Sequence, residues 1–391
     1  MYRRPVSPIG LAADGSDELA PLGRLPFITK HDIRRDFPRN FLRAEVNLDA
    51  LLDQRLVELE HTSGTSEERT PLLLPRGWWA EQEARALRLN PWVAGVLAES
   101  PAARRVTLAP PVCGGDVCYS GVPSRFERVV GNALFVVLSQ HPWLWSDAEL
   151  DRMVEEASGW SPVFLDLDPV YGVRFAMHCE RRGVRLPSLR FILCSYEFES
   201  VMHRRILQRV FGVPVFNLYG STEIGHLLME DEAGRCVPIC QTAALELVER
   251  DAAGIGELVV TTLTNDYMPL IRYRIGDLAE AGPVGERPAH IVHGRVKDAL
   301  VATDGSRVTT RQVDQCFAGT SGLAHYELRQ LPDGRWRLRY VPDSEAPDAA
   351  SLAGLRTRLE ALLGPGTCTA MEATDLLLPE RPGKFQLTAR L

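Results

Sequence analysis

Apolar and polar positions alternate in blocks of strand and helix length through the middle of the chain. Two short apolar runs, "PVFLDLDP" (162–169) and "LRFILCS" (189–195), are bounded by Pro, Asp and Ser, a pattern that predicts buried strands. Apolar residues then recur at helical spacing in "FESVMHRRILQRVFG" (198–212), and a further apolar run follows in "VPVFNLYGSTE" (213–223). This strand–helix–strand order predicts a parallel sheet with a right-handed crossover.

Polar loops follow two of these predicted strands. One is "CSYEFES" (194–200) and the other is "YGSTE" (219–223). The carboxyl ends of parallel strands meet at one edge of an open sheet, where ligands bind. We therefore expect the functional site at this edge.

The pattern changes toward the C-terminus. Apolar and polar residues alternate around a turn in "AALELVERDAAGIGELVVTTL" (243–263), and again in "AHYELRQLPDGRWRLRYVP" (324–342), and both stretches predict antiparallel hairpins. "SLAGLRTRLEALLG" (351–364) predicts an amphipathic helix, and "TAMEATDLLLP" (369–379) predicts the last strand.

These elements define an α/β fold class with two expected domains. A large N-terminal domain, residues 1–295, has mixed or parallel sheets, and its first 60 or so residues are irregular, with a helix starting after Thr29. A small α+β C-terminal domain, residues 296–391, follows the connection "HGRVKDALV" (293–301).

Composition excludes several classes of protein. The formal net charge of −7 and the lack of a basic cluster argue against a nucleic-acid surface. No apolar run is long enough to span a bilayer, and the first 20 residues lack the apolar core of a signal peptide, so we expect a cytoplasmic protein with no membrane partner.

The eight cysteines are scattered, which favours reduced thiols over a disulfide framework. Two pairs, Cys113 with Cys118 and Cys236 with Cys240, are candidate ligands of a structural zinc site. Neither pair has the usual tight two-residue spacing, so small buried thiols are the favoured interpretation.

Lysine is nearly absent from the chain. Of the 44 basic residues, only Lys30, Lys297 and Lys384 are lysines, and the rest are arginines. A lysine retained against this preference marks a position where a compact ammonium on a flexible stem is needed, although each could also be a chance survivor.

The segment "HTSGTSEERT" (61–70) combines hydroxyls and a glycine with two acidic residues. Small residues leave backbone N–H groups free to bind an anion, and hydroxyls add donors. Glu67 and Glu68 would repel a phosphate chain, so these residues alone leave open whether the segment is a phosphate loop or a polar turn.

Taken in order, several motifs resemble those of the adenylate-forming superfamily, in its phenylacetate–coenzyme A ligase-like branch. The motifs cover nearly the whole chain: "LPFITKHDIRRDFP" (25–38), "TSGTS" (62–66), "SYE" (195–197), "YGSTE" (219–223), "PLIRYRIGD" (269–277), "GRVKD" (294–298) and "PGKFQLTARL" (382–391). Each motif alone has a structural explanation, as a strand end, a turn or a solvated tail. Their common order makes the resemblance specific.

The resemblance implies an ATP-dependent ligase that forms an acyl-adenylate from a small carboxylic acid and passes the acyl group to a thiol. Its catalytic residues would be Lys384, Thr222 and Glu223, with Glu223 also holding Mg²⁺. Lys384 would bridge the substrate carboxylate and the α-phosphate, two anions that otherwise repel. The nucleotide-binding residues it implies are Ser63, Gly64, Thr65, Arg69, Ser195, Tyr196, Glu197, Tyr219, Gly220, Ser221, Thr222, Asp277 and Arg295.

Within this set, the resemblance assigns particular roles. Tyr219 offers a ring face to adenine, Asp277 accepts hydrogen bonds from the ribose hydroxyls, and Arg295 contacts ribose or phosphate. The family's phosphate loop usually continues with a second glycine and a Pro–Lys pair, and here Arg69 is the candidate replacement for that lysine.

The acid pocket is expected between the loops 194–200 and 219–226, where side chains suit a planar aromatic acid. Its candidate residues, which could equally belong to the core, are Tyr196, Phe198, Ile224, Gly225 and His226.

The family resemblance also implies that the C-terminal domain is mobile and swings about a hinge. Lys297 occupies the hinge position, where aspartate is more usual in this branch. The acceptor is left open: coenzyme A, the phosphopantetheine of an acyl carrier protein, or an amine. An amide-forming enzyme and a non-catalytic adenylate-binding protein therefore remain alternatives, and the oligomeric state is not predicted.

Overall fold

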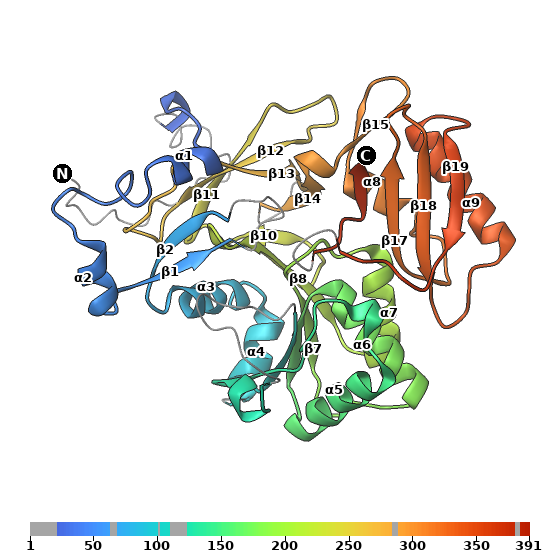
Figure 1. The fold of residues 1–391 in the computed structure, drawn as a ribbon, viewed down its shortest axis with the longest axis horizontal. Coiled ribbons are helices and arrows are strands. Elements are labelled where there is room, and N and C mark those ends of the chain that lie inside the picture. The colour runs from blue at the N-terminus through green and yellow to red at the C-terminus, as the bar shows by residue number, and fades with distance from the viewer. Residues whose placement is uncertain (1–21, 63–68, 101, 110–122, 284–287, 380–383) are drawn as a thin grey trace. The chain divides into compact units, whose positions relative to one another are not determined.

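The computed structural model describes residues 22–62, 69–100, 102–109, 123–283, 288–379 and 384–391 (Figure 1). The chain forms two compact units, each assembled from separate stretches. The first unit comprises Met1–Thr62, Glu68–Pro91 and Tyr219–Ile291, and the second comprises Ser63–Glu67, Trp92–Leu218 and Val292–Leu391.

The first unit contains mostly antiparallel sheet. Strands β11 (Ala243–Val248), β12 (Gly256–Thr262) and β13 (Tyr273–Ala281) form a meander, which confirms the hairpin predicted over 243–263. The Asp251 carboxylate accepts hydrogen bonds from the amides of Ala253 and Ile255, both at 3.0 Å, and so shapes the turn.

Shorter elements complete this unit. Strands β9 (Gly225–Glu230) and β10 (Cys236–Pro238) pair antiparallel, as do β1 (Val57–His61) and β2 (Pro71–Pro75). The helical segments are η1 (Leu22–Arg24), α1 (Lys30–Arg35), α2 (Leu48–Asp53) and α3 (Trp78–Leu87). Helix α1 begins directly after Thr29, as predicted, in a capping box in which Asp32 accepts from the Thr29 amide at 2.9 Å.

The second unit contains the parallel sheet. Its strands lie in the order β8 (Val215–Ser221), β7 (Phe191–Cys194), β6 (Phe164–Leu167), β3 (Arg105–Leu108), β5 (Ala133–Phe135) and β4 (Val129–Val130), of which only β4 runs antiparallel to its neighbour. The predicted strand–helix–strand unit is confirmed as β7, α7 (Val201–Phe211) and β8. Other helical segments are α4 (Pro91–Glu99), η2 (Phe126–Arg128), η3 (Pro142–Leu144), α5 (Asp147–Trp160) and α6 (Pro169–Arg182).

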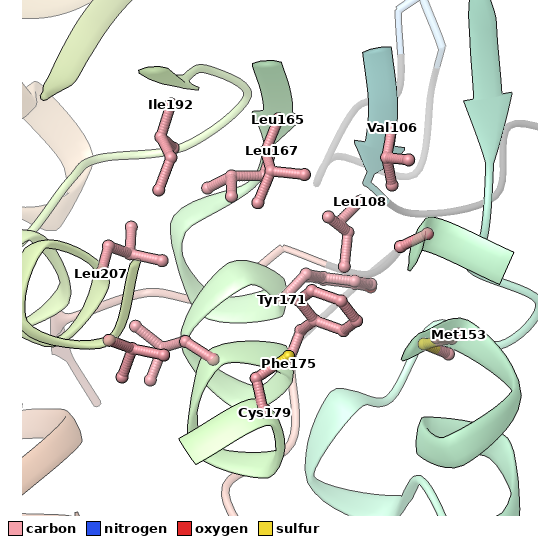
Figure 2. Close-up of a cluster of buried hydrophobic side chains, with 14 of the residues drawn as sticks. Val106, Leu108, Met153, Leu165, Leu167, Tyr171, Phe175, Cys179, Ile192 and Leu207 are labelled. Atoms are coloured by element: carbon pink, nitrogen blue, oxygen red, sulfur yellow. The ribbon is translucent and has the colours of Figure 1, made fainter. Parts of the chain in front are cut away.

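Helix α6 packs its apolar side against this sheet (Figure 2). Tyr171 and Phe175 of α6 are fully buried with Leu165 and Leu167 of β6. Each fully buried side chain of this size contributes about 1.5–3 kcal/mol, so this cluster fixes the strand ends that carry the polar loops.

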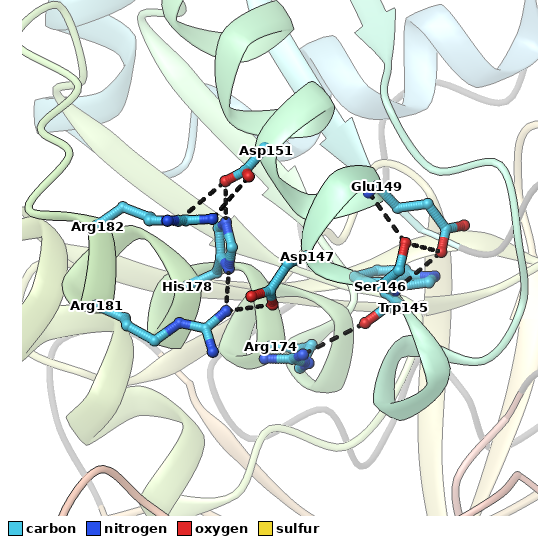
Figure 3. Close-up of polar contacts among 9 residues, drawn as sticks. All are labelled: Trp145, Ser146, Asp147, Glu149, Asp151, Arg174, His178, Arg181 and Arg182. Atoms are coloured by element: carbon cyan, nitrogen blue, oxygen red, sulfur yellow. Dashed lines mark hydrogen bonds and ion pairs between the residues drawn. The ribbon is translucent and has the colours of Figure 1, made fainter.

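A polar network holds α5 against α6 (Figure 3). The ring of His178 is fully buried, with Nε2 at 2.7 Å from Asp151 and Nδ1 at 2.8 Å from an Arg181 guanidinium nitrogen. Arg182 also donates to Asp151, and Arg181 to Asp147. Because every polar atom of His178 has a partner, we interpret this network as structural.

The C-terminal part of the chain folds around its own sheet. Strands run in the order β19 (Cys368–Ala373), β18 (Trp336–Pro342), β17 (Leu323–Gln330) and β20 (Thr388–Arg390), with β17 and β18 forming the predicted hairpin. Helices α8 (Thr310–Gln315) and α9 (Ala349–Leu363) cover one face, and β15 (Leu300–Val301), β16 (Arg307–Val308) and η4 (Val296–Asp298) complete this part. Strand β14 (His290–Arg295) belongs instead to the large sheet, where it lies between β13 and β10.

One strand prediction needs correction here. The segment 369–379 does contain strand β19, but this is not the last strand, because the chain continues to β20, which pairs parallel with β17. A strand of three residues is too short to show a period, and its pairing with β17 defines it instead. The predicted α/β fold class is confirmed, with a large mixed sheet and a smaller C-terminal one.

In the described residues, no helix is both long and apolar enough to cross a bilayer.

Candidate active site

The "YGSTE" segment of the first unit leads from the end of β8 toward β9. Gly220 is required there, because a Cβ at this position would lie 2.2 Å from the carbonyl oxygen of Gly225. The turn that follows buries Glu223, which is only 6% exposed. Lys30 of α1 lies 2.9 Å from the Glu223 carboxylate, and the Tyr273 hydroxyl donates to it at 3.2 Å.

The pKa of Glu223 reflects two opposing effects. Burial raises it, but the charge and hydrogen bond of Lys30 outweigh burial and bring the pKa below its ordinary value. Glu223 is therefore anionic at neutral pH. One of the three lysines of the chain provides the counter-charge.

Tyr219 and Asp277 are directly linked in the first unit. The Tyr219 hydroxyl donates to the Asp277 carboxylate at 2.6 Å, and Asp277 lies on β13. A short hydrogen bond to a carboxylate is a strong one, so it holds the ring of Tyr219 in one orientation.

Three of the five predicted acid-pocket residues also lie in the first unit. Ile224 is fully buried, and Gly225 has φ of +76° with no room for a side chain beside Trp78. The His226 ring lies edge to face with the Trp79 ring, with centroids 5.6 Å apart. The other two, Tyr196 and Phe198, belong to the second unit.

The "SYE" loop of the second unit follows β7 and is held by Asp166 of β6. The Ser195 hydroxyl donates to one oxygen of Asp166 at 3.0 Å, and the Tyr196 hydroxyl donates to the other at 3.1 Å. Tyr196 has φ of +72°, a strained conformation for a residue with a side chain. Sequence reasoning missed Asp166, although an aspartate inside an apolar strand is a signal that could have identified it.

The near-terminal lysine lies against this loop. The Lys384 ammonium donates to the carbonyl oxygen of Tyr196 at 3.4 Å. The next amide, that of Phe385, donates to both carboxylate oxygens of Glu197, at 2.8 and 3.1 Å. The second unit thus brings three predicted site residues together: Lys384, Tyr196 and Glu197.

A second buried carboxylate lies in the same region. Asp168 is 0% exposed and caps α6, with one oxygen accepting from the Val170 amide at 2.9 Å. Burial raises its pKa to about 7, although the helix amides and the charge of Lys384 oppose this. Sequence reasoning missed Asp168, whose signal was its position directly before the Pro that starts α6.

Glu197 has a pKa raised well above its ordinary value by burial and then by the neighbouring Asp168. The charges of Lys384 and Arg295 act against this rise. Lys384 therefore lies near two acids, and its positive charge favours their ionised forms.

The C-terminal sheet contacts α7 through groups that sequence reasoning missed. Asp314 accepts from the Ser200 hydroxyl and from the Val201 amide, the latter at 3.0 Å. The rings of His203 and His325 are both buried, with Nε2 of the first 3.1 Å from Nδ1 of the second. Burial lowers the pKa of His203 to about 3.

Further contacts extend this packing. Trp143 stacks on His325 with centroids 5.9 Å apart, and Phe385 lies edge to face with His325 at 5.0 Å. Phe198, predicted in the acid pocket, packs against the apolar cluster of the C-terminal part. These contacts hold the Lys384 segment in its observed place.

The predicted hinge lies between β14 and β15. Arg295 is the last residue of β14, and Lys297 is exposed in the short helix η4. The neighbouring Asp298 accepts from the Gln386 amide nitrogen at 3.0 Å, and its carbonyl accepts from the Thr388 hydroxyl at 2.8 Å. The hinge segment and the lysine-bearing segment are therefore bonded together.

The predicted phosphate-loop residues Ser63, Gly64 and Thr65 lie outside the described residues. Arg69 is exposed, and the Thr62 amide donates to the Thr70 carbonyl oxygen at 3.0 Å. Ser221 ends β8, and Thr222 begins the turn after it.

Neither Cys236 nor Cys240 forms a disulfide. Within the described ranges no group of His, Cys, Asp or Glu side chains could hold a metal ion, whereas Cys113 and Cys118 lie outside those ranges.

Comparison with known proteins shows which proteins the chain resembles. No protein-family model matches the chain. It is 22% identical over 370 residues to the phenylacetate-coenzyme A ligase of Aromatoleum evansii. This alignment covers 89% of this chain and 78% of the relative. The chain is 24% identical over 352 residues to the phenylacetate-coenzyme A ligase of Thermus thermophilus. This alignment covers 84% of this chain and 73% of the relative.

A solved structure has a similar fold. The 2-hydroxyisobutyryl-CoA ligase in complex with 2-HIB-AMP aligns with a TM-score of 0.65 at 16% identity, covering 94% of this chain and 80% of that one. The chain therefore has the fold of the adenylate-forming CoA ligases. The predicted resemblance to the phenylacetate–coenzyme A ligases is confirmed over most of its length.

Proposed function

We propose that this protein is an ATP-dependent ligase that activates a small carboxylic acid as its acyl-adenylate and then passes the acyl group to a thiol. The observation that carries the proposal is the contact of Lys384 and Phe385 with Tyr196 and Glu197. A lysine near the end of the chain is held against the loop after β7, at the sheet edge where α/β proteins bind ligands.

The chemistry needs positive charge at that place. When a carboxylate attacks the α-phosphorus of ATP, both reacting groups are anionic and pyrophosphate leaves as a further anion. The ammonium of Lys384 would hold the substrate carboxylate against the α-phosphate and stabilise the charge that develops between them. Thr222 and Ser221 would donate hydroxyl hydrogen bonds to the same phosphate.

Tyr219 and Asp277, which are hydrogen-bonded to each other, would bind the nucleoside. The ring of Tyr219 would stack on adenine, in the orientation that its hydrogen bond to Asp277 supports. Asp277 would accept from the ribose, and Arg295 would contact ribose or phosphate. The remaining proposed nucleotide contacts are Ser63, Gly64, Thr65, Arg69, Ser195, Tyr196, Glu197 and Gly220.

Glu223 fits the chemistry of a magnesium ligand. Mg²⁺ takes oxygen donors, and Glu223 offers a buried carboxylate that is ionised at neutral pH. When bound, the ion would neutralise charge on the ATP phosphates.

We further propose that the acid is aromatic and that its pocket includes Tyr196, Phe198, Ile224, Gly225 and His226. The acceptor would be coenzyme A or the phosphopantetheine of an acyl carrier protein. The proposed domains are residues 1–295 and 296–391, with the second moving about Lys297 between the two half-reactions.

ATP–pyrophosphate exchange with a panel of aryl acids, phenylacetate and benzoate included, tests the proposal. We expect exchange that depends on both an acid and Mg²⁺. Adding coenzyme A, a carrier protein or an amine to the productive mixture and identifying the product then determines the acceptor. Nucleotide binding without exchange for any acid would contradict the proposal and indicate a non-catalytic adenylate-binding protein.

A further inference from the structure

A strained turn carries the atoms that contact the lysine-bearing segment. Tyr196 has φ of +72°, and the amide of Glu197 donates across it to the Ser195 carbonyl oxygen at 2.8 Å. A hydrogen bond that closes over a single residue of positive φ is the rare and strained form of the γ-turn. Because the strain favours another conformation, such a turn persists only where neighbouring groups hold it.

Asp166 provides two of these holding contacts from the neighbouring strand β6. Its side chain is only 7% exposed, and its two carboxylate oxygens accept from the hydroxyls of Ser195 and Tyr196, at 3.0 and 3.1 Å. A guanidinium nitrogen of Arg105 on β3 lies 3.9 Å from the oxygen that accepts from Tyr196. Hydrogen bonds to a carboxylate are stronger than those between neutral groups, so one side chain fixes two consecutive residues of the turn.

The position of Asp166 in the sheet separates it from the apolar core. Leu165 and Leu167, its neighbours in β6, pack in one cluster with Tyr171 of α6 (Figure 2). Side chains alternate between the two faces of a strand, so Asp166 lies on the face opposite to α6. Its contribution is therefore to the turn after β7 and not to the packing of that cluster.

The turn sets the place of two groups that bind the end of the chain. The Tyr196 carbonyl oxygen accepts from the Lys384 ammonium, and the Glu197 carboxylate accepts from the Phe385 amide. A change of φ at Tyr196 to the negative region would rotate its carbonyl and the residue that follows. Both acceptors of the lysine-bearing segment would then point elsewhere.

We propose that Asp166 is a positioning residue for Lys384. By holding Tyr196 in the strained turn, it keeps the carbonyl oxygen at the place where the ammonium binds. This inference rests on the proposed function, because it gives Asp166 a part in placing the ammonium for adenylation. Holding a reacting group in place beforehand lowers the entropy lost on the way to the transition state.

The scarcity of lysine allows this placement to be measured without any activity, because the chain has only Lys30, Lys297 and Lys384. Reductive methylation with carbon-13 formaldehyde labels each lysine, and the spectrum of Lys384→Arg identifies the Lys384 signal. In Asp166→Ala we expect this signal to move toward that of the exposed Lys297, while the Lys30 signal stays in place. An unchanged Lys384 signal, or an equal movement of the Lys30 signal, would overturn the inference.

Glycine at position 196 tests whether Asp166 acts through the strained turn. Glycine adopts a positive φ without steric cost, so a turn with glycine at its centre no longer needs to be held. In a Tyr196→Gly background, Asp166→Ala should therefore move the Lys384 signal much less than it does in the wild-type background. Equal movement in the two backgrounds would contradict an effect through Tyr196.

Exchange kinetics provide the third measurement. At saturating ATP, we expect Asp166→Ala to lower ATP–pyrophosphate exchange by about tenfold or more, because a displaced reacting group is costly. Asp166→Asn keeps the shape and one acceptor oxygen and should retain part of the rate. Thr107→Val is the matched control, since Thr107 is buried on β3 directly beside Asp166 in the sheet register, and it should leave the rate unchanged.

The outcomes separate this inference from the proposed function. A full exchange rate in Asp166→Ala, or an equal loss in Thr107→Val, would overturn the role of Asp166. A wild type that shows no exchange with any acid would contradict the proposed function instead, and the lysine spectra would still decide whether Asp166 places Lys384.

Discussion

The Lys30 ammonium lies 2.9 Å from the buried carboxylate of Glu223. Lys30 lies in α1 near the start of the described chain, and Glu223 lies in the turn between β8 and β9. A chain that uses arginine almost everywhere thus keeps a lysine at a site where the cation meets a single buried carboxylate.

Replacing Lys30 with Met should leave Glu223 buried without its counter-charge. We expect the free energy of unfolding to fall by about 2 kcal/mol, less than for a fully buried pair because Lys30 is partly exposed. Denaturant unfolding measures this, with Arg35→Met as a charge-matched control on the same helix. An equal loss in both variants would mean that the ion pair contributes nothing of its own.

The same pair predicts a pH dependence. The pKa of Glu223 is lowered in the folded state, so the pair stabilises the fold above the ordinary glutamate pKa. This stabilisation is lost as the pH falls through the lowered pKa. Comparing wild type with Lys30→Met between pH 7 and pH 3 should show the difference in stability shrinking at the acid end, whereas a constant difference would argue against the electrostatic explanation.

Tyr219 and Asp277 should have separable effects on ATP binding. Tyr219→Phe keeps the ring and removes only the hydroxyl, so we expect the KM for ATP to rise less than Asp277→Ala raises it. Loss of two hydrogen bonds to ribose would weaken binding by about tenfold or more. If Tyr219→Phe were as damaging as Asp277→Ala, the hydroxyl rather than the ring face would be the important group.

Glu197 should act through the lysine-bearing segment. Glu197→Ala removes the acceptor of the Phe385 amide as well as a proposed nucleotide contact, so we expect the exchange rate to fall about tenfold and the KM for ATP to rise. Glu197→Gln keeps one acceptor oxygen and should retain part of the rate. A rise in the KM for ATP with an unchanged maximal rate would indicate that the nucleotide contact is the whole role of Glu197, and would contradict an effect through the lysine-bearing segment.

The buried pair His203 and His325 should make the fold sensitive to acid. Burial lowers the pKa of both rings, so the folded state keeps them neutral while the unfolded chain protonates them below about pH 6.5. Stability is then lost as the pH falls below that value, by up to about 1.4 kcal/mol per pH unit for each histidine.

Burial raises the pKa of Asp168 and Asp314, so these two acids make the folded state more stable as the pH falls, which opposes the effect of the histidines. The histidine effect is therefore measured by comparing the pH profile of a variant with that of the wild type. We expect the double variant His203→Gln with His325→Gln to lose less stability than wild type between pH 6.5 and pH 4.5 in thermal unfolding. Parallel pH profiles would contradict the role assigned to the pair.

Local patterns account for the parts of the fold that were predicted. Strands β6, β7 and β8 and helix α7 were predicted correctly because their periods and bounding residues are continuous in sequence. The three-residue strand β20 was not, because it exists only through its pairing with β17. Propensity and period do not carry such information.

The same distinction applies to the candidate site: residues in local motifs were predicted, whereas residues that depend on distant partners were not. Motifs in "YGSTE", "RYRIGD" and the terminal "GK" identified Glu223, Asp277 and Lys384 as candidates. The buried partners Asp166 and Asp168, and the histidine pair 122 positions apart, were missed. Their significance depends on partners that only the folded chain supplies.

The central claim is that the ammonium of Lys384 drives the adenylation step, and ATP–pyrophosphate exchange by Lys384→Ala tests it most directly. With wild-type thermal stability retained, we expect exchange to fall by about 10²-fold or more, as when a single group that stabilises developing charge is removed. Exchange that survives the substitution undiminished would contradict the account.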